Sequence, residues 1–113
     1  KVRSATGVRS SLVGSVGEQA IVFDDILDTG GTLVACVQGL REAGVRRIAI
    51  GVTHGLFTGT AWQQLWDLGV DSIVCTDSVG GPAPVDPRVK VIACASALLP
   101  ALRASAEVSP AAA

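Results

Sequence analysis

The sequence is poor in charge, and its few charged groups nearly cancel. Charged residues make up 17% of the 113 residues, and the formal net charge at pH 7 is −1. Proteins that bind nucleic acid through bulk charge carry a clear positive excess, so this balance argues against such a partner. The 49% of hydrophobic residues instead predicts one globular domain with a real core.

Membrane and metal-binding signals are also missing. No apolar run reaches the roughly 18 residues of a membrane span, and no signal peptide is visible. Cys36, Cys75 and Cys94 lie far apart in apolar runs, form no C-x-x-C pair and have no His at ligand spacing. We expect buried free thiols and a cytoplasmic location. Because the first residue is Lys1 rather than Met, we also expect a piece of a longer protein.

Short apolar stretches alternate with amphipathic ones along the chain. Buried strands are expected at 20–23, 47–53, 72–76 and 89–94, with a further strand within 8–16. Helices are expected over 32–44, 59–69 and 96–106; the first two end at Gly44 and Gly69, and the last is kinked or begun afresh near Pro100.

This alternation predicts the α/β class, with a mostly parallel sheet flanked by helices on both faces. The domain is expected over 1–106. The tail 107–113, with Pro110 and three alanines, is expected to be disordered. Trp62 and Trp66 lie four residues apart and are interpreted as core or subunit-contact residues rather than a stacking platform.

Three polar clusters follow the first three buried strands. They read "DDILDTGGT" after the first, "THGLFTG" after the second and "TDSVGG" after the third. Ligands of open α/β sheets bind beyond the carboxyl ends of the strands, so the fold should gather these clusters into one site. His54, in the second cluster, is interpreted as a structural residue that holds its loop.

The first cluster has the chemistry of a phosphate cradle. Gly30 and Gly31 are both expected to turn with positive φ, and Gly31 is expected to tolerate no side chain. A helix starting near Thr32 directs its free N–H groups and dipole into the loop, and Thr29 adds a hydroxyl donor. No Lys follows the glycines, so this is not a Walker loop.

Asp24 and Asp25 would repel the phosphate that this loop attracts. They fit if they face sugar hydroxyls, since a carboxylate accepts hydrogen bonds from a vicinal diol. A nearby Mg²⁺ ion would also offset their charge. Taken alone, the Asp24–Asp25 pair is commonly a solvated strand end and the Gly30–Gly31 pair a plain turn. The two together, after a buried strand and before a helix, predict a phosphorylated sugar as the ligand.

The string "VFDDILDTGGTL" resembles the fingerprint of phosphoribosyltransferases. The segments "LVGSVGEQAIVFDD", "THGLFTG", "TDSV" and "ASALLPALRA" together resemble the C-terminal half of ribose-phosphate pyrophosphokinase (phosphoribosyl pyrophosphate synthetase). The resemblance covers residues 1 to about 106. It implies a three-layer, type I phosphoribosyltransferase-like fold.

The resemblance implies diphosphoryl transfer from ATP to the 1-hydroxyl of ribose 5-phosphate, with Mg²⁺, in a cytoplasmic homo-oligomer. Asp24 and Asp25 would lie at the ribose hydroxyls, and the 5-phosphate loop would comprise Asp28, Thr29, Gly30, Gly31 and Thr32. Lys1 and Arg3 match the family's catalytic Lys-x-Arg pair, whose cations would stabilise the transferring group. An N-terminal half, absent from this chain, would supply most of the ATP site.

Two other functions stay open at this point. A phosphoribosyltransferase that consumes phosphoribosyl pyrophosphate shares the fingerprint, but it would need a segment that binds a nucleobase, and none is visible. A non-catalytic regulatory homologue would keep the fold but would be expected to lose acids or glycines from the loop. This chain retains them.

Overall fold

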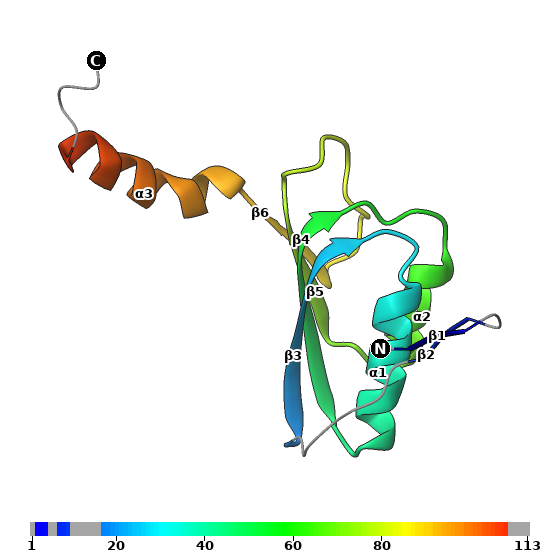
Figure 1. Ribbon diagram of the computed structural model, residues 1–113. Helices are drawn as coiled ribbons and strands as arrows, with labels where there is room; N and C mark the ends of the chain where they lie inside the picture. The colour runs from blue at the N-terminus through cyan, green and yellow to red at the C-terminus, as the bar shows by residue number, and fades with distance from the viewer. Residues whose placement is uncertain (1, 5–6, 10–16, 109–113) are drawn as a thin grey trace.

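The computed structural model describes residues 2–4, 7–9 and 17–108 (Figure 1). A short antiparallel pair, β1 (Val2–Ser4) and β2 (Gly7–Arg9), precedes the main sheet. The main sheet contains β3 (Gln19–Leu27), β4 (Arg47–Gly55), β5 (Ser72–Thr76) and β6 (Val89–Ile92). The helices are α1 (Gly31–Glu42), a 3₁₀ turn η1 (Ala61–Gln63), α2 (Gln64–Asp67) and α3 (Cys94–Val108).

The four main strands are parallel and lie in the order β3-β4-β5-β6. Sequential parallel neighbours place the carboxyl ends of β3, β4 and β5 side by side at one edge. This arrangement confirms the α/β class and the parallel sheet predicted from the apolar strands. The strand predicted within 8–16 is only partly tested, because β2 ends at Arg9 and residues 10–16 lie outside the described part.

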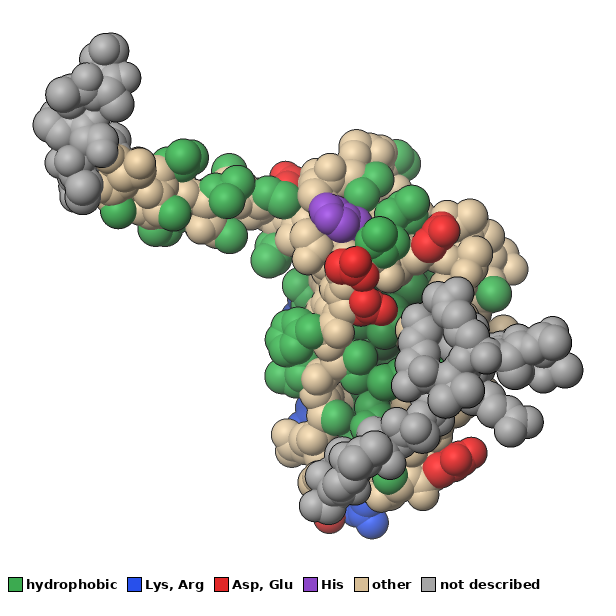
Figure 2. All heavy atoms as spheres, viewed as in Figure 1, with side chains coloured by type: hydrophobic (Ala, Val, Ile, Leu, Met, Phe, Trp, Pro, Cys, Tyr) green, Lys and Arg blue, Asp and Glu red, His purple; other side chains and the backbone are tan. Residues whose placement is uncertain are grey.

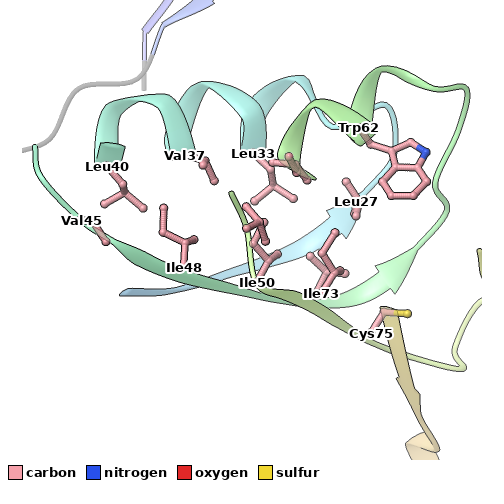
Figure 3. Close-up of a cluster of buried hydrophobic side chains, with 13 residues drawn as sticks. Leu27, Leu33, Val37, Leu40, Val45, Ile48, Ile50, Trp62, Ile73 and Cys75 are labelled. Carbon is pink, nitrogen blue, oxygen red and sulfur yellow. The ribbon is translucent and has the colours of Figure 1, made fainter. Parts of the chain in front are cut away.

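The hydrophobic core lies between α1, α2 and one face of the sheet (Figure 3). Alternate residues of β4 point into it, so Ile48, Ile50 and Val52 are buried. Leu33, Val37 and Leu40 of α1 pack against them, as their helical spacing predicts. Trp62 is only 4% exposed, which confirms its core role.

Glycines end both helices that cover the core. Gly44 has φ +93° and Gly69 has φ +80°, the left-handed conformation of a helix stop. The second helix is shorter than predicted, because η1 and α2 together begin only at Ala61. The Trp62 ring N–H donates to the Gly59 carbonyl at 3.1 Å, and this contact holds the preceding residues in a loop.

The opposite face of the sheet is open in the described part of the chain. Phe23 is 79% exposed and Ile21 67% exposed, both in the middle of β3. Helices α1 and α2 lie on the core face, and α3 extends away from the sheet (Figure 1). The described elements therefore differ from the predicted arrangement with helices on both faces, because no described helix packs over Ile21 and Phe23.

Helix α3 runs through Pro100 without starting afresh. Its leucines Leu98, Leu99 and Leu102 are exposed. It includes Glu107 and Val108 of the predicted tail, while 109–113 lie outside the described residues. None of the described helices is both long enough and apolar enough to cross a membrane.

The described cysteines are free, as predicted. Cys75 is buried in the core, whereas Cys36 and Cys94 are half-buried. Removal from water disfavours the thiolate, so burial raises the pKa values of the Cys36 and Cys75 thiols.

Arg41 joins the ends of α1 and α2. Its guanidinium donates to the carbonyl groups of Leu68 at 2.6 Å and Gly69 at 2.7 Å, and also to those of Val45 and Arg46. These carbonyl groups lie just after the C-terminal ends of the two helices, where no further turn of helix supplies an N–H donor. One guanidinium therefore provides the hydrogen bonds that the helices cannot provide.

We predict that Arg41→Met lowers the free energy of unfolding by about 2 kcal/mol, because hydrogen bonds to a charged group are lost and two of their acceptors, the Val45 and Leu68 carbonyls, stay partly buried. The matched control is Arg47→Met. Among the described residues the Arg47 side chain forms only an exposed ion pair, with Asp71 at 3.8 Å, so its loss should cost less than about 1 kcal/mol. Urea unfolding measures both, and equal losses would contradict the role given to Arg41.

Candidate functional site

The three polar clusters meet at the carboxyl edge of the sheet, as predicted. The backbone N–H groups of Leu56 and Phe57 donate to the Leu27 carbonyl at 2.8 and 3.1 Å, and that of Thr58 donates to Asp28 at 2.9 Å. The loop after β4 is thereby tied to the loop after β3. Thr76 Oγ1 donates to the Thr53 carbonyl at 2.6 Å and connects the end of β5 to β4.

Asp24 and Asp25 lie together near the end of β3. Asp24 Oδ1 accepts the backbone N–H of Asp25 at 2.8 Å, and Asp25 Oδ1 accepts that of Ile26 at 2.9 Å. Hydrogen bonding with the Asp24 carboxyl is the largest influence lowering the pKa of Asp25, followed by the backbone N–H groups. Asp25 therefore stays ionised to lower pH than an ordinary aspartate, ready to accept hydrogen bonds.

Gly30 is the special position of the glycine pair. It has φ +91° and is buried, and a Cβ there would lie 2.8 Å from the Cα and Cβ atoms of Trp62. No L-residue fits this conformation and this contact without a shift of the backbone. Gly30 thus allows the chain to turn from β3 into α1 directly beneath η1.

Gly31 differs from its prediction. It is the first residue of α1, its φ is not positive, and a Cβ there would meet no atom of the described residues within 4 Å. The expectation of a positive φ at Gly31 is wrong, because a single left-handed residue completes the turn. Since no described residue limits a side chain at Gly31, such a limit would have to come from a bound ligand.

The N-terminus of α1 opens into this loop. Gly30 caps the helix without a side-chain hydrogen bond, and the first turn contains no acidic residue. The N–H groups of the first turn have no partners within the helix, and they carry its positive dipole end. Asp28, Thr29 and Gly31 are exposed and Thr32 is half-buried, so the predicted loop residues surround these N–H groups.

A groove of about 860 Å³ runs from the acids along the open face of the sheet. Asp24, Asp25, Thr53 and Thr76 line its polar end, and Ile21, Phe23 and Val74 contribute to its apolar part. Figure 2 shows the single His, in purple, next to acidic side chains in red.

Other predicted residues lie apart from this groove or outside the described chain. The Asp77 carboxylate accepts the backbone N–H of Cys94 at 2.8 Å, which lowers the pKa of Asp77 and anchors the start of α3. Trp66 packs beside Trp62, and the Arg88 guanidinium lies 4.0 Å from the centroid of the Trp66 ring. Arg3 pairs through its backbone with Val8, while Lys1 is outside the described residues.

Sequence reasoning missed Ser78, which forms a 2.7 Å hydrogen bond with His54. Its only available signal was its place in the third polar cluster. Among the described residues, no three His, Cys, Asp or Glu side chains form a metal-binding group.

Comparison with known proteins gives a family match over residues 7–104, to a family described as the phosphoribosyl synthetase-associated domain. The chain is 38% identical over 73 residues to a ribose-phosphate pyrophosphokinase of Corynebacterium efficiens. The matched region covers 64% of this chain and 22% of that protein. The chain is 33% identical over 106 residues to the enzyme of that name from Bifidobacterium longum, covering 90% of this chain and 31% of that protein.

A solved structure is also similar. The crystal structure of phosphoribosylpyrophosphate synthetase from Mycobacterium smegmatis matches with a TM-score of 0.64 and 32% identity, over 81% of this chain and 33% of that chain. The chain thus spans between about a fifth and a third of the length of these relatives.

The two glycines allow a matched prediction. Gly30→Ala should lower the free energy of unfolding by more than about 1 kcal/mol, because a left-handed Ala is strained and its Cβ meets Trp62. Gly31→Ala should be neutral or stabilise by up to about 1 kcal/mol, because Ala favours the helix. Urea unfolding measures both variants. A Gly30→Ala chain as stable as the unaltered one would refute this account of the turn.

Proposed function

Because the chain belongs to the phosphoribosyl synthetase-associated domain family, we propose that it supplies the ribose 5-phosphate-binding part of a ribose-phosphate pyrophosphokinase. In that reaction the sugar's 1-hydroxyl oxygen attacks the β-phosphorus of ATP. The bond between the α,β-bridging oxygen and the β-phosphorus breaks, the hydroxyl proton is lost, and AMP leaves. The product is phosphoribosyl pyrophosphate.

The observation that carries the proposal is the placement of two acids close to the N-terminus of α1, which receives no side-chain capping hydrogen bond from its N-cap, Gly30. The N–H groups at the start of α1 attract the 5-phosphate, and Gly31 leaves open space in front of them. The exposed Asp25 and half-buried Asp24 accept hydrogen bonds from the ribose hydroxyls. In this arrangement Asp28, Thr29, Gly30, Gly31 and Thr32 form the phosphate loop.

The relatives' names favour the synthetase over the other two functions. The curated relatives cited above are ribose-phosphate pyrophosphokinases, and the cited structure is a phosphoribosylpyrophosphate synthetase. In our proposal the chain corresponds to the C-terminal, type I phosphoribosyltransferase-like half of such an enzyme. Regions of the relatives beyond the match would provide most ATP contacts and the surfaces of a homo-oligomer, and the enzyme would act in the cytoplasm.

A magnesium ion fits the residues that are present. Mg²⁺ keeps several waters and binds through one or two carboxylates together with substrate phosphates. Asp24 and Asp25 can supply such carboxylates next to the bound sugar. The ion would neutralise charge on the diphosphoryl group as it transfers.

Lys1 and Arg3 are proposed as the catalytic cations. The transferring diphosphoryl group spreads negative charge over its oxygens, and two nearby cations would stabilise that charge. The phosphate loop and the acids lie within residues 24–32, so binding of the sugar phosphate should not require Lys1 or Arg3.

We predict that the double variant Asp24→Asn/Asp25→Asn binds ribose 5-phosphate about tenfold or more weakly than the unaltered chain, because hydrogen bonds to charged carboxylates are lost. Stability should change by less than about 1 kcal/mol, since both sites have access to water. Isothermal titration calorimetry measures the affinity.

Asp71→Asn is the control, because it removes one carboxylate charge just before β5, at the opposite edge of the sheet. It should leave the affinity unchanged. Equal affinity in the double variant and the unaltered chain would remove the assignment of the acids. Consumption of phosphoribosyl pyrophosphate with a nucleobase would replace the synthetase with a transferase.

A further inference from the structure

His54 takes part in a hydrogen-bond chain that joins the ends of β4 and β5. Its Nδ1 lies 2.7 Å from Ser78 Oγ, and Ser78 Oγ lies 3.0 Å from the Thr53 carbonyl oxygen. The Ser78 backbone N–H donates to Thr76 Oγ1 at 3.2 Å, which fixes the position of the serine. The imidazole is therefore held on one side by a hydrogen-bonded turn.

The direction of these hydrogen bonds follows from the acceptor at the end of the chain. A carbonyl oxygen can only accept, so the single hydroxyl proton of Ser78 is directed to Thr53. Ser78 Oγ must then accept a proton from the imidazole, which makes Nδ1 the protonated nitrogen. In the neutral ring, Nε2 consequently carries the lone pair and is an acceptor.

The free nitrogen belongs to the same edge of the sheet as the acids. His54 pairs in register with Ile26, the residue after Asp25, and a charge on the His54 ring would favour ionised Asp25. Within the described part of the chain, no hydrogen bond is formed by Nε2. The ring is half-buried, so a bound molecule can reach one side of it.

We propose that His54 is a further ligand-binding residue: Ser78 holds the ring through Nδ1, and Nε2 accepts a hydrogen bond from a hydroxyl group of the sugar at Asp25. This inference rests on the proposed function, because it requires a sugar phosphate at the carboxyl edge. A lone pair at Nε2 suits a hydroxyl donor and not a phosphate oxygen. His54 should therefore recognise the sugar and leave phosphate binding to α1.

The first test is nitrogen NMR of the imidazole in the complete chain. The sequence has one His, so the ring gives one pair of nitrogen signals. At a pH where the ring is neutral, Nδ1 should be the protonated nitrogen. Addition of ribose 5-phosphate should shift the Nε2 signal more than the Nδ1 signal, whereas inorganic phosphate should shift neither.

Two substitutions distinguish the proposed roles of the two ring nitrogens, Nδ1 as the donor to Ser78 and Nε2 as the acceptor from the sugar. In His54→Asn the amide can replace Nδ1 as the donor to Ser78 but offers nothing at the position of Nε2. In His54→Gln the longer side chain can place an oxygen acceptor near that position. We expect His54→Asn to weaken ribose 5-phosphate binding by about two- to tenfold, the effect of one hydrogen bond, and His54→Gln to retain more of the affinity.

Ser78→Ala should also weaken ribose 5-phosphate binding and move the ring proton toward Nε2, while Ser78→Thr, which keeps the hydroxyl, should restore both. Inorganic phosphate should bind equally to all four variants, and thermal unfolding verifies that each is folded. Normal sugar-phosphate affinity in His54→Asn, or a proton on Nε2 of the neutral ring in the unaltered chain, would overturn the proposal.

Failure of this proposal can be told from failure of the proposed function. If Asp24→Asn/Asp25→Asn loses affinity while His54→Asn does not, the sugar-phosphate site stands and the role of His54 is wrong. If the unaltered chain binds no ribose 5-phosphate, the proposed function fails and the role of His54 fails with it.

Discussion

Trp62 can pack against the start of α1 only because Gly30 has no side chain. The closest approach that a Cβ would make is 2.8 Å, to backbone and side-chain atoms of the tryptophan. The same indole contacts Phe57 edge-on, with ring centroids 5.0 Å apart, and belongs to the core with Leu27. This one buried contact therefore fixes where β3 ends, where α1 begins and where the loop after β4 lies. The geometry of the candidate site thus depends on packing in the core.

Much of this architecture could be predicted from the sequence. The strand 72–76 agrees with β5, the glycines at 44 and 69 end their helices, and the order of elements predicts the parallel sheet that places the three polar clusters together. These features depend on local patterns, namely apolar runs, helical spacing and glycine stops. The meeting of the clusters follows from parallel topology alone.

The remaining features depend on contacts between distant residues. The two glycines look alike in sequence, and only the position of Trp62 shows that Gly30 carries the left-handed turn and Gly31 the helix start. The late start of η1 follows from the hydrogen bond between Trp62 and Gly59. The partnership of His54 with Ser78, 24 residues away, arises only when β4 and β5 pair.

In our account, this chain and the remaining regions of its longer relatives have different roles. The proposed phosphate loop and the two acids lie within residues 24–32, whereas the exposed Phe23 and Ile21 leave one sheet face open in the described chain. Relatives are about three to five times longer than the part that this chain matches. Binding of the sugar phosphate is thus separable, in our account, from placement of ATP.

The central claim is that a sugar phosphate binds at the N-terminus of α1 with its hydroxyls at the acids. Titration of the ¹⁵N-labelled chain with ribose 5-phosphate, followed by amide NMR, tests it most directly. The account predicts saturable shifts concentrated at residues 28–32 and at Asp24 and Asp25, with none at Asp71 on the opposite edge. Saturable shifts confined to other residues, or no response at 28–32, would contradict it.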